Sequence, residues 1–197
     1  MALSFAKAGA SKIAVGARSD MSQLAKDLEA AALSANRSAP KVLLLNLDVT
    51  NEQSVEKATA KVGKEFGKLD VLVNNAGILG QFGMVADSNP EKWWQVLDVN
   101  IRGPYLVTRA FIPLLLEGTE EKFIINVTSV GAHLVNPALS AYQVSKLGLL
   151  RFSQLVNAEY SPQGVVSICI HPGNCLTDIM GPQEELPDHL KPSMYHR

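Results

Sequence analysis

The sequence predicts an α/β protein built in three layers around a doubly wound parallel sheet. Short runs rich in Val, Ile and Leu alternate with longer segments of helical periodicity, which is the pattern of repeated strand–helix units. The short runs are apolar on both faces, as parallel strands are when helices cover each side. Polar and glycine-containing segments follow these runs, where such sheets place their ligand sites.

Five strands are expected from the apolar runs. They cover Lys12–Ala17, Lys41–Leu47, Leu69–Asn74, Phe123–Thr128 and Val165–Ile170. Two of the intervening segments carry apolar residues on one helical face, namely Met21, Leu24, Ala25, Leu28 and Ala32 in the first and Val55, Ala58, Val62 and Phe66 in the second. Helices of this kind, placed between the strands, allow successive strands to run parallel.

Helix starts are marked by capping residues. Thr50 with Gln53 matches a capping box at the start of the second helix. Asn89 followed by Pro90 is a favourable N-cap and first helical position for a further helix. One more helix is expected from about Ser140 to Tyr160.

Composition and charge limit the function classes. With 197 residues, of which 47% are hydrophobic and 19% charged, the chain can bury a core as a single domain over residues 1–197, ending in an irregular tail at 181–197. A net charge of -1 gives no reason to expect a nucleic-acid partner. No apolar run approaches the roughly 20 residues that cross a bilayer, and the first residues do not resemble a signal peptide. We therefore expect a cytoplasmic protein without a membrane partner.

Ser129, Tyr142 and Lys146 have the spacing of one active site. Tyr142 and Lys146 stand four residues apart and so share one face of the predicted helix. An ammonium beside a phenol favours the phenolate, which can exchange a proton with an alcohol oxygen. Ser129, at the end of an apolar run, can hydrogen-bond the same substrate oxygen. A tyrosine and a lysine four residues apart also occur by chance in many helices, so this pair alone does not establish the chemistry.

Polar segments at the ends of four strands support the same site. They are Asp48–Val49, Asn74–Gly77, Asn126–Ser129 and His171–Thr177. Any one of them is explained by the preference of turns for Asn, Asp and Gly. Because all four meet at one edge of a parallel sheet, together with Tyr142 and Lys146, we interpret them as a nucleotide-binding edge.

In these segments the chain resembles the classical short-chain dehydrogenases/reductases, from Met1 to about Asp178. The matching positions are Asp48 with Val49, Asn74-Asn75-Ala76-Gly77, Asp98-Val99-Asn100, Ser129, Tyr142-Gln143-Val144-Ser145-Lys146, Pro172 with Gly173, and Thr177. Each motif is short, but their order and spacing together are specific. The resemblance implies a Rossmann-like fold and the transfer of a hydride between a nicotinamide cofactor and a carbonyl or alcohol.

The resemblance implies four catalytic residues. Tyr142 would be the general acid and base, while Lys146 would favour its phenolate and hold the nicotinamide ribose. Ser129 would orient the substrate carbonyl. Asn100 would bend its helix and help to hold a water that links Lys146 to a proton relay.

The resemblance also assigns residues to the cofactor. Asp48 and Val49 would contact the adenine, and Asn75, Ala76 and Gly77 would support the floor of the binding site. The nicotinamide end would meet Tyr142, Lys146, Pro172, Gly173, Cys175 and Thr177. At the position of Cys175 the family more often has a branched aliphatic residue.

Arg18 determines the expected cofactor. After the first predicted strand, Arg18 and Ser19 stand in place of the acidic residue that would grip a ribose diol. A cation there can bind a 2′-phosphate, so NADP(H) is favoured over NAD(H), although a solvated loop arginine is the alternative. The expected substrate is a ketone or secondary alcohol of a small or medium hydrophobic metabolite, which the apolar residues Leu134, Val135 and Met180 suggest.

Two further expectations concern metals and subunits. His171 and Cys175 alone do not make a zinc site, so no metal is expected. The helix that carries Lys146 has more apolar surface than one core-facing stripe, at Leu147, Leu150, Phe152 and Leu155. In the family, this helix and the one near Pro104–Leu116 form a dimer seam, so the resemblance implies a homodimer or homotetramer.

Both ends depart from the family pattern. Full-length relatives begin with a strand and a glycine-rich turn that cradles the pyrophosphate, whereas this sequence opens within the following helix, at Ala2–Ala10. It stops after Thr177 without the usual final helix and edge strand. The strands at Lys12 and Leu69 would then lack the strand between them, unless they pair directly. Two hypotheses follow: a truncated oxidoreductase, or a non-catalytic relic or dimerisation partner that binds no cofactor.

Overall fold

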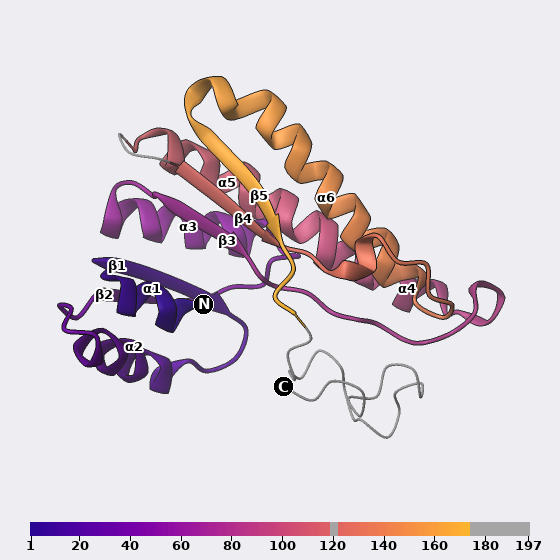
Figure 1. The fold of residues 1–197 in the computed structure, drawn as a ribbon, viewed down its shortest axis with the longest axis horizontal. Coiled ribbons are helices and arrows are strands. Elements are labelled where there is room, and N and C mark those ends of the chain that lie inside the picture. The colour runs from indigo at the N-terminus through magenta and orange to yellow at the C-terminus, as the bar shows by residue number, and fades with distance from the viewer. Residues whose placement is uncertain (119–121, 174–197) are drawn as a thin grey trace.

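A computed structural model describes residues 1–118 and 122–173 of the chain, so the tail expected at 181–197 lies outside the described residues (Figure 1). Its strands are β1 (Lys12–Ala17), β2 (Lys41–Asn46), β3 (Val71–Asn74), β4 (Lys122–Val127) and β5 (Val165–Ile170). Their bounds match the expected strands to within two residues, which confirms that the apolar runs are strands. All the strand pairs are parallel, as expected for an α/β fold of this kind.

The strands form two separate sheets. One contains β1 and β2, paired from Lys12 with Lys41 to Ala17 with Asn46. The other has the order β3-β4-β5, with Asn74 of β3 opposite Asn126 of β4. β1 and β3 do not pair directly in the described part of the chain, so the break that the sequence predicts between them is present. The two sheets lie next to each other in Figure 1, with the carboxyl ends of their strands toward the same side.

Helices cover both faces of these sheets. On one side, α1 (Ala2–Ala8) and α2 (Ser22–Ser34) enclose a small apolar cluster with β1. The larger core is formed with α3 (Glu52–Phe66), α5 (Gly103–Leu116) and α6 (Ser140–Tyr160), while α4 (Pro90–Leu97) precedes α5. None of the helices within residues 1–118 and 122–173 has the length and apolarity needed to span a bilayer.

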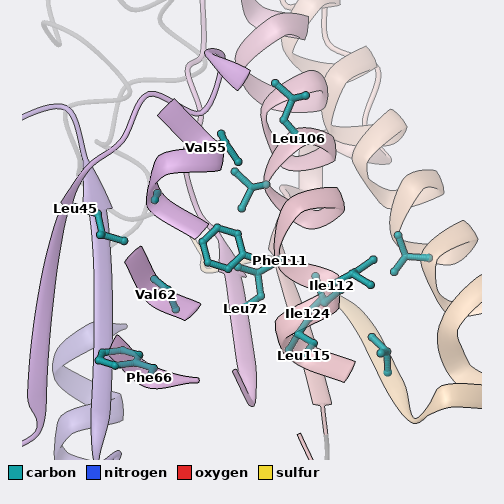
Figure 2. Close-up of a cluster of buried hydrophobic side chains, with 14 residues drawn as sticks. Leu45, Val55, Val62, Phe66, Leu72, Leu106, Phe111, Ile112, Leu115 and Ile124 are labelled. Carbon is teal, nitrogen blue, oxygen red and sulfur yellow. The ribbon is translucent and has the colours of Figure 1, made fainter. Parts of the chain in front are cut away.

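The larger core crosses the break between the sheets. Figure 2 shows Leu45 of β2, Phe66 of α3, Leu72 of β3 and Phe111 of α5 within one cluster of buried side chains. Each of these residues is less than one-tenth exposed. Because no backbone ladder connects the two sheets within residues 1–118 and 122–173, they are joined there by side-chain packing around α3.

Two lysines fasten the C-terminal end of α3 to the smaller sheet. Lys12 Nζ donates to the carbonyl of Phe66 at 3.1 Å, and Lys41 Nζ donates to the Glu65 carboxylate at 2.8 Å. Both ammonium groups lie near the Phe66 ring, 5.7 and 5.8 Å from its centroid. Cations in this position favour the negative end of the helix dipole and supply partners for its last carbonyls.

The predicted capping box at the start of α3 is wrong. The N-cap is Asn51, whose side-chain oxygen accepts from the amide of Ser54 at 2.9 Å. Thr50 lies outside the helix because its amide and hydroxyl both donate to the Asp48 carboxylate, at 2.9 and 2.7 Å. Asn89, in contrast, caps α4 as expected, accepting from Lys92 at 3.0 Å.

Candidate active site

Tyr142 and Lys146 lie on the same face of α6, beside the end of β4. The Lys146 Nζ atom is 5.7 Å from the centroid of the Tyr142 ring. Ser129 follows β4, and its hydroxyl accepts from the amide of Gly131 at 3.1 Å. Gly131 also faces the Tyr142 ring, because a β-carbon placed on it would lie 3.4 Å from Ser129 Oγ and 3.5 Å from a ring carbon of Tyr142. The structure thus brings Ser129, Tyr142 and Lys146 together.

Lys146 carries its amine in a largely closed environment. The residue is 3% exposed, and its Nζ donates to the carbonyl of Val127 at 2.9 Å. Burial of the ammonium lowers the pKa of Lys146 to about 8, an effect that the nearby Cys169 thiol partly opposes. Burial likewise raises the pKa of the Cys169 thiol. The amine of Lys146 therefore loses its proton more readily than the amine of an ordinary lysine.

Asn100 lies in a π-helical turn, Asp98–Arg102, between α4 and α5. Pro104 has no amide hydrogen to donate to the Asn100 carbonyl, which explains locally why the regular helix is interrupted there. The Asn100 side chain accepts from the amide of Ile78 and donates to its carbonyl, both at 2.9 Å. It also donates to the Ser145 hydroxyl at 2.9 Å. Asn100 thereby joins the segment after β3 to α6.

Gly77 fits between Asn100 and Lys146. A β-carbon at this position would lie 3.3 Å from Asn100 Oδ1 and 3.4 Å from Lys146 Nζ. A side chain here would crowd both polar groups, so glycine suits a backbone this close to them. Asn75 and Ala76, just before Gly77, are exposed. This part of the predicted cofactor floor therefore borders the Lys146 amine.

A buried polar network beneath the site was not foreseen from the sequence. Asn74 donates to Thr108 at 3.0 Å and to Asn126 at 2.8 Å. Asn126 in turn donates to Ser167 at 3.1 Å, and Ser167 shares a hydrogen bond with Ser153 at 2.7 Å. The network links α5, all three strands of the larger sheet and α6. Its only sequence signal is an asparagine near the end of two strands, which becomes informative once their register is known.

The predicted adenine end lies on the smaller sheet. Arg18 is exposed after β1 and lines a cleft of about 350 Å³ with Ser19, Ser22 and Asn46. The Asp48 carboxylate is held by Thr50, whose two hydrogen bonds lower the pKa of Asp48 with help from the Arg18 charge.

The side chain of Val49 faces inward. A β-carbon on Gly103 would lie 2.8 Å from Val49 Cγ2, so this side chain packs against α5. Any contact of Val49 with a nucleotide would use its backbone. Pro172 and Gly173 end the described chain after β5, while Cys175, Thr177 and Met180 lie outside the described residues.

A parallel α/β fold with Ser, Tyr and Lys side chains gathered at the carboxyl edge of its sheet defines the class of protein. The profile described as short chain dehydrogenase matches residues 1–187. The chain is 62% identical over 191 residues to the short chain dehydrogenase pigC of Monascus ruber, covering 97% of this chain and 63% of that protein. The chain belongs to the short-chain dehydrogenase/reductase family.

Solved structures agree with this assignment. The chain is similar to levodione reductase with a TM-score of 0.82 at 25% identity, covering 93% of this chain and 70% of that one. It is also similar to an alcohol dehydrogenase from the archaeon Thermococcus sibiricus, complexed with 5-hydroxy-NADP, with a TM-score of 0.77 at 26% identity, covering 90% and 72% of the two chains. The chain spans less than two thirds of the length of pigC.

Proposed function

We propose that the protein is an oxidoreductase that transfers a hydride between NADP(H) and a ketone or secondary alcohol. The observation that carries this proposal is the position of the Lys146 amine, which lies beside Asn100 and Gly77 and 5.7 Å from the centroid of the Tyr142 ring, with Ser129 next to that ring at Gly131. A buried amine next to a phenol, at the carboxyl edge of a parallel sheet, is an arrangement suited to proton exchange with a substrate oxygen.

In this proposal each side chain has a separate task during ketone reduction. Tyr142 donates its proton to the carbonyl oxygen, which the Ser129 hydroxyl holds by a hydrogen bond. The Lys146 ammonium, 5.7 Å from the Tyr142 ring centroid, stabilises the phenolate that remains. Asn100 keeps the Ile78 backbone next to this amine through two hydrogen bonds of 2.9 Å. Alcohol oxidation uses the same groups in reverse.

NADP(H) fits two features of this chain. Gly77 has no side chain, so its backbone lies close to the Lys146 amine, where the nicotinamide end of the cofactor is expected, and the cleft at Arg18 offers a cation with the hydroxyl of Ser19. A 2′-phosphate would gain a charge-assisted hydrogen bond from Arg18. The carboxylate of Asp20 in the same cleft is engaged by the Ser22 amide and hydroxyl at 3.0 and 2.8 Å. When bound, NADP(H) supplies or accepts the hydride.

A small or medium hydrophobic metabolite is the proposed substrate. The segment that follows Ser129 carries Leu134 and Val135, which are 47% and 96% exposed. Apolar side chains exposed to this extent next to the candidate site favour an apolar ligand over a highly charged one. His133 in the same segment is also exposed.

A homo-oligomer formed through α6 is part of the same proposal. Val144, Leu147 and Leu155 lie at helical spacing on α6 and are each about half exposed. Tyr105 on α5 is 47% exposed and extends the apolar area. Light scattering of the chain and of Leu147→Asp tests this point, since the variant should shift a dimer or tetramer toward the monomer.

The central experiment is a titration of the purified chain with NADPH, followed by fluorescence. Saturable binding is expected, and its absence at millimolar cofactor would contradict the proposed function for this chain. In a spectrophotometric assay with a panel of apolar ketones, Tyr142→Phe should abolish turnover while NADPH affinity stays near that of the wild type. Retained turnover would remove Tyr142 from its proposed role.

Cofactor preference is tested at Arg18. Arg18→Ala should weaken NADPH binding about 10- to 100-fold, the range for a charge-assisted hydrogen bond, while NADH binding changes little. Lys26→Ala is the matched control, because it removes an exposed cation from α2 outside the cleft lining. Equal losses for NADPH and NADH in Arg18→Ala would contradict the preference for NADP(H).

A further inference from the structure

The first turn of α6, which carries Tyr142, begins without a side-chain cap. Leu139 is the N-cap residue and provides no side-chain hydrogen bond to the helix. The first amides of a helix have no partner within the helix, and a polar N-cap side chain usually supplies one. Tyr142 is the third helical residue and so belongs to this first turn, which has no side-chain cap. Its position therefore depends on contacts from other elements.

Trp93 of α4 makes one of these contacts. Its indole Nε1 donates to the Ser140 hydroxyl at 3.0 Å, across 47 residues of sequence. Trp93, Leu139, Ala141 and Tyr142 also line one narrow crevice, so the indole lies along the first turn of α6. The neighbouring Trp94 meets the Trp93 ring edge-on at 5.4 Å and is itself 64% exposed.

Asn100, in the π-helical turn that follows α4, makes a second contact with α6 near Tyr142. The Asn100 side chain, in the π-helical turn that continues α4, donates to the Ser145 hydroxyl at 2.9 Å. Ser145 in turn donates to the carbonyl of Tyr142 at 2.7 Å. One continuous segment, from Trp93 to Asn100, thus contacts α6 before and after Tyr142.

The turn is also tied to the loop before it. The Gln143 side chain accepts from the amide of Asn136 at 3.1 Å and donates to its carbonyl at 2.9 Å. This pair fixes the loop to α6 at Gln143, the residue that follows Tyr142. The Trp93 contact is the one that fixes the first helical residue, Ser140, to a separate element.

We propose that Trp93 is a positioning residue for Tyr142, acting through its indole hydrogen bond to Ser140. The inference rests on the proposed function, because it assigns a catalytic consequence to the placement of Tyr142. Without the bond, the first turn of α6 samples a wider range of positions, and the tyrosine hydroxyl spends less time at the substrate oxygen. The effect should appear in kcat, while the affinity for NADPH stays near that of the wild type, because Arg18 and Asp48 at the proposed adenine end follow strands of the smaller sheet, away from this turn.

The test compares Trp93→Phe and Ser140→Ala with Ser140→Thr, which keeps a hydroxyl, and with Trp94→Phe, a matched loss of an exposed indole. Hydrogen exchange of the amides from Gln143 to Lys146 is measured in the full chain without cofactor, and kcat and KM are measured in NADPH-dependent ketone reduction. Trp93→Phe and Ser140→Ala should each speed exchange and lower kcat about 3- to 10-fold, as expected for one lost hydrogen bond. The KM for NADPH should not change.

Three comparisons decide the outcome. Ser140→Thr and Trp94→Phe should behave as the wild type, and the double variant Trp93→Phe/Ser140→Ala should be no worse than either single one. Ser140→Ala removes only one oxygen. If amide exchange from Gln143 to Lys146 is unchanged in this variant, the hydrogen bond between Trp93 and Ser140 does not hold the first turn of α6. Faster exchange with unaltered kcat overturns the positioning role. A wild-type chain with no turnover refutes the proposed function and, with it, the positioning role of Trp93. In that case the exchange data still show whether the hydrogen bond between Trp93 and Ser140 holds the first turn of α6.

Discussion

Replacing Lys146 with methionine should change how the stability of the fold depends on pH. The amine is 3% exposed, and burial lowers its pKa to about 8 from an ordinary value of 10.5. In the unfolded chain the same amine keeps its proton up to about pH 10.5. Between these two values the unfolded state binds more protons than the folded state. The wild-type free energy of unfolding should therefore rise as pH increases through this window.

The size of the effect follows from the shift. One pKa unit corresponds to about 1.36 kcal/mol, so the contribution of Lys146 should grow by about 2.5 kcal/mol between pH 7 and pH 10. For a chain of this length that corresponds to a rise of about 5–10 °C in Tm, relative to a protein without the group. Lys146→Met has a side chain of similar length and lacks this titration.

The assay is urea unfolding of the wild type and Lys146→Met at several pH values from 7 to 10. Both proteins also carry Cys169→Ala, because the Cys169 thiol interacts with the Lys146 charge and would titrate differently once Lys146 is replaced. The remaining titrating groups contribute similarly to both proteins, so the difference between the two free energies isolates Lys146. At pH 7 the difference also contains the lost hydrogen bond to Val127, which adds a nearly constant offset. A difference that stays flat to within about 0.5 kcal/mol across the range would refute a buried, titrating amine at this position.

Three further predictions concern stability. Asn51→Ala should lower the free energy of unfolding in urea by about 1 kcal/mol, whereas Gln53→Ala should have little effect; the opposite order would restore the capping box. Asn126→Ala should cost about 2–4 kcal/mol in the same assay, since it removes both of its buried hydrogen bonds, and a loss below about 1 kcal/mol would contradict the network. Gly103→Ala should lower Tm through a loss of about 1–3 kcal/mol, because its new β-carbon would lie 2.8 Å from Val49 Cγ2; an unchanged Tm would argue against this close packing.

The sequence is informative about this fold where a signal is local. Apolar runs flanked by turn residues predict the five strands, and Asn89 with Pro90 predicts the start of α4. The start of α3 shows the limit of such signals, because Thr50 and Asn51 are both good caps by type. The choice depends on Asp48, whose carboxylate takes both donors of Thr50. A competing local hydrogen bond therefore decides the helix boundary.

Contacts between distant segments are much harder to predict. The spacing of Tyr142 and Lys146 is visible in one helix, but the bond between Trp93 and Ser140 joins positions 47 residues apart. The link from Asn74 to Asn126 likewise requires the parallel register of β3 and β4. The periodicity of apolar residues predicts which helix or strand a residue belongs to. It does not predict which side chains of different elements are in contact. These tertiary hydrogen bonds therefore emerge only from the folded arrangement.

The geometry of the proposed cofactor site depends on α3 more than on any strand pairing. Arg18 and Asp48 follow β1 and β2, while Tyr142 and Lys146 border the larger sheet, and no backbone ladder joins the two sheets in the part of the chain that the structure describes. Their relative placement is held by α3, whose apolar face packs into the shared core and whose C-terminal end is held by Lys12 and Lys41. The packing of Val49 against Gly103 of α5 adds a second link between the two halves. Because a close-packed core transmits strain, the distance between the two halves of the site should be sensitive to changes in the core around α3.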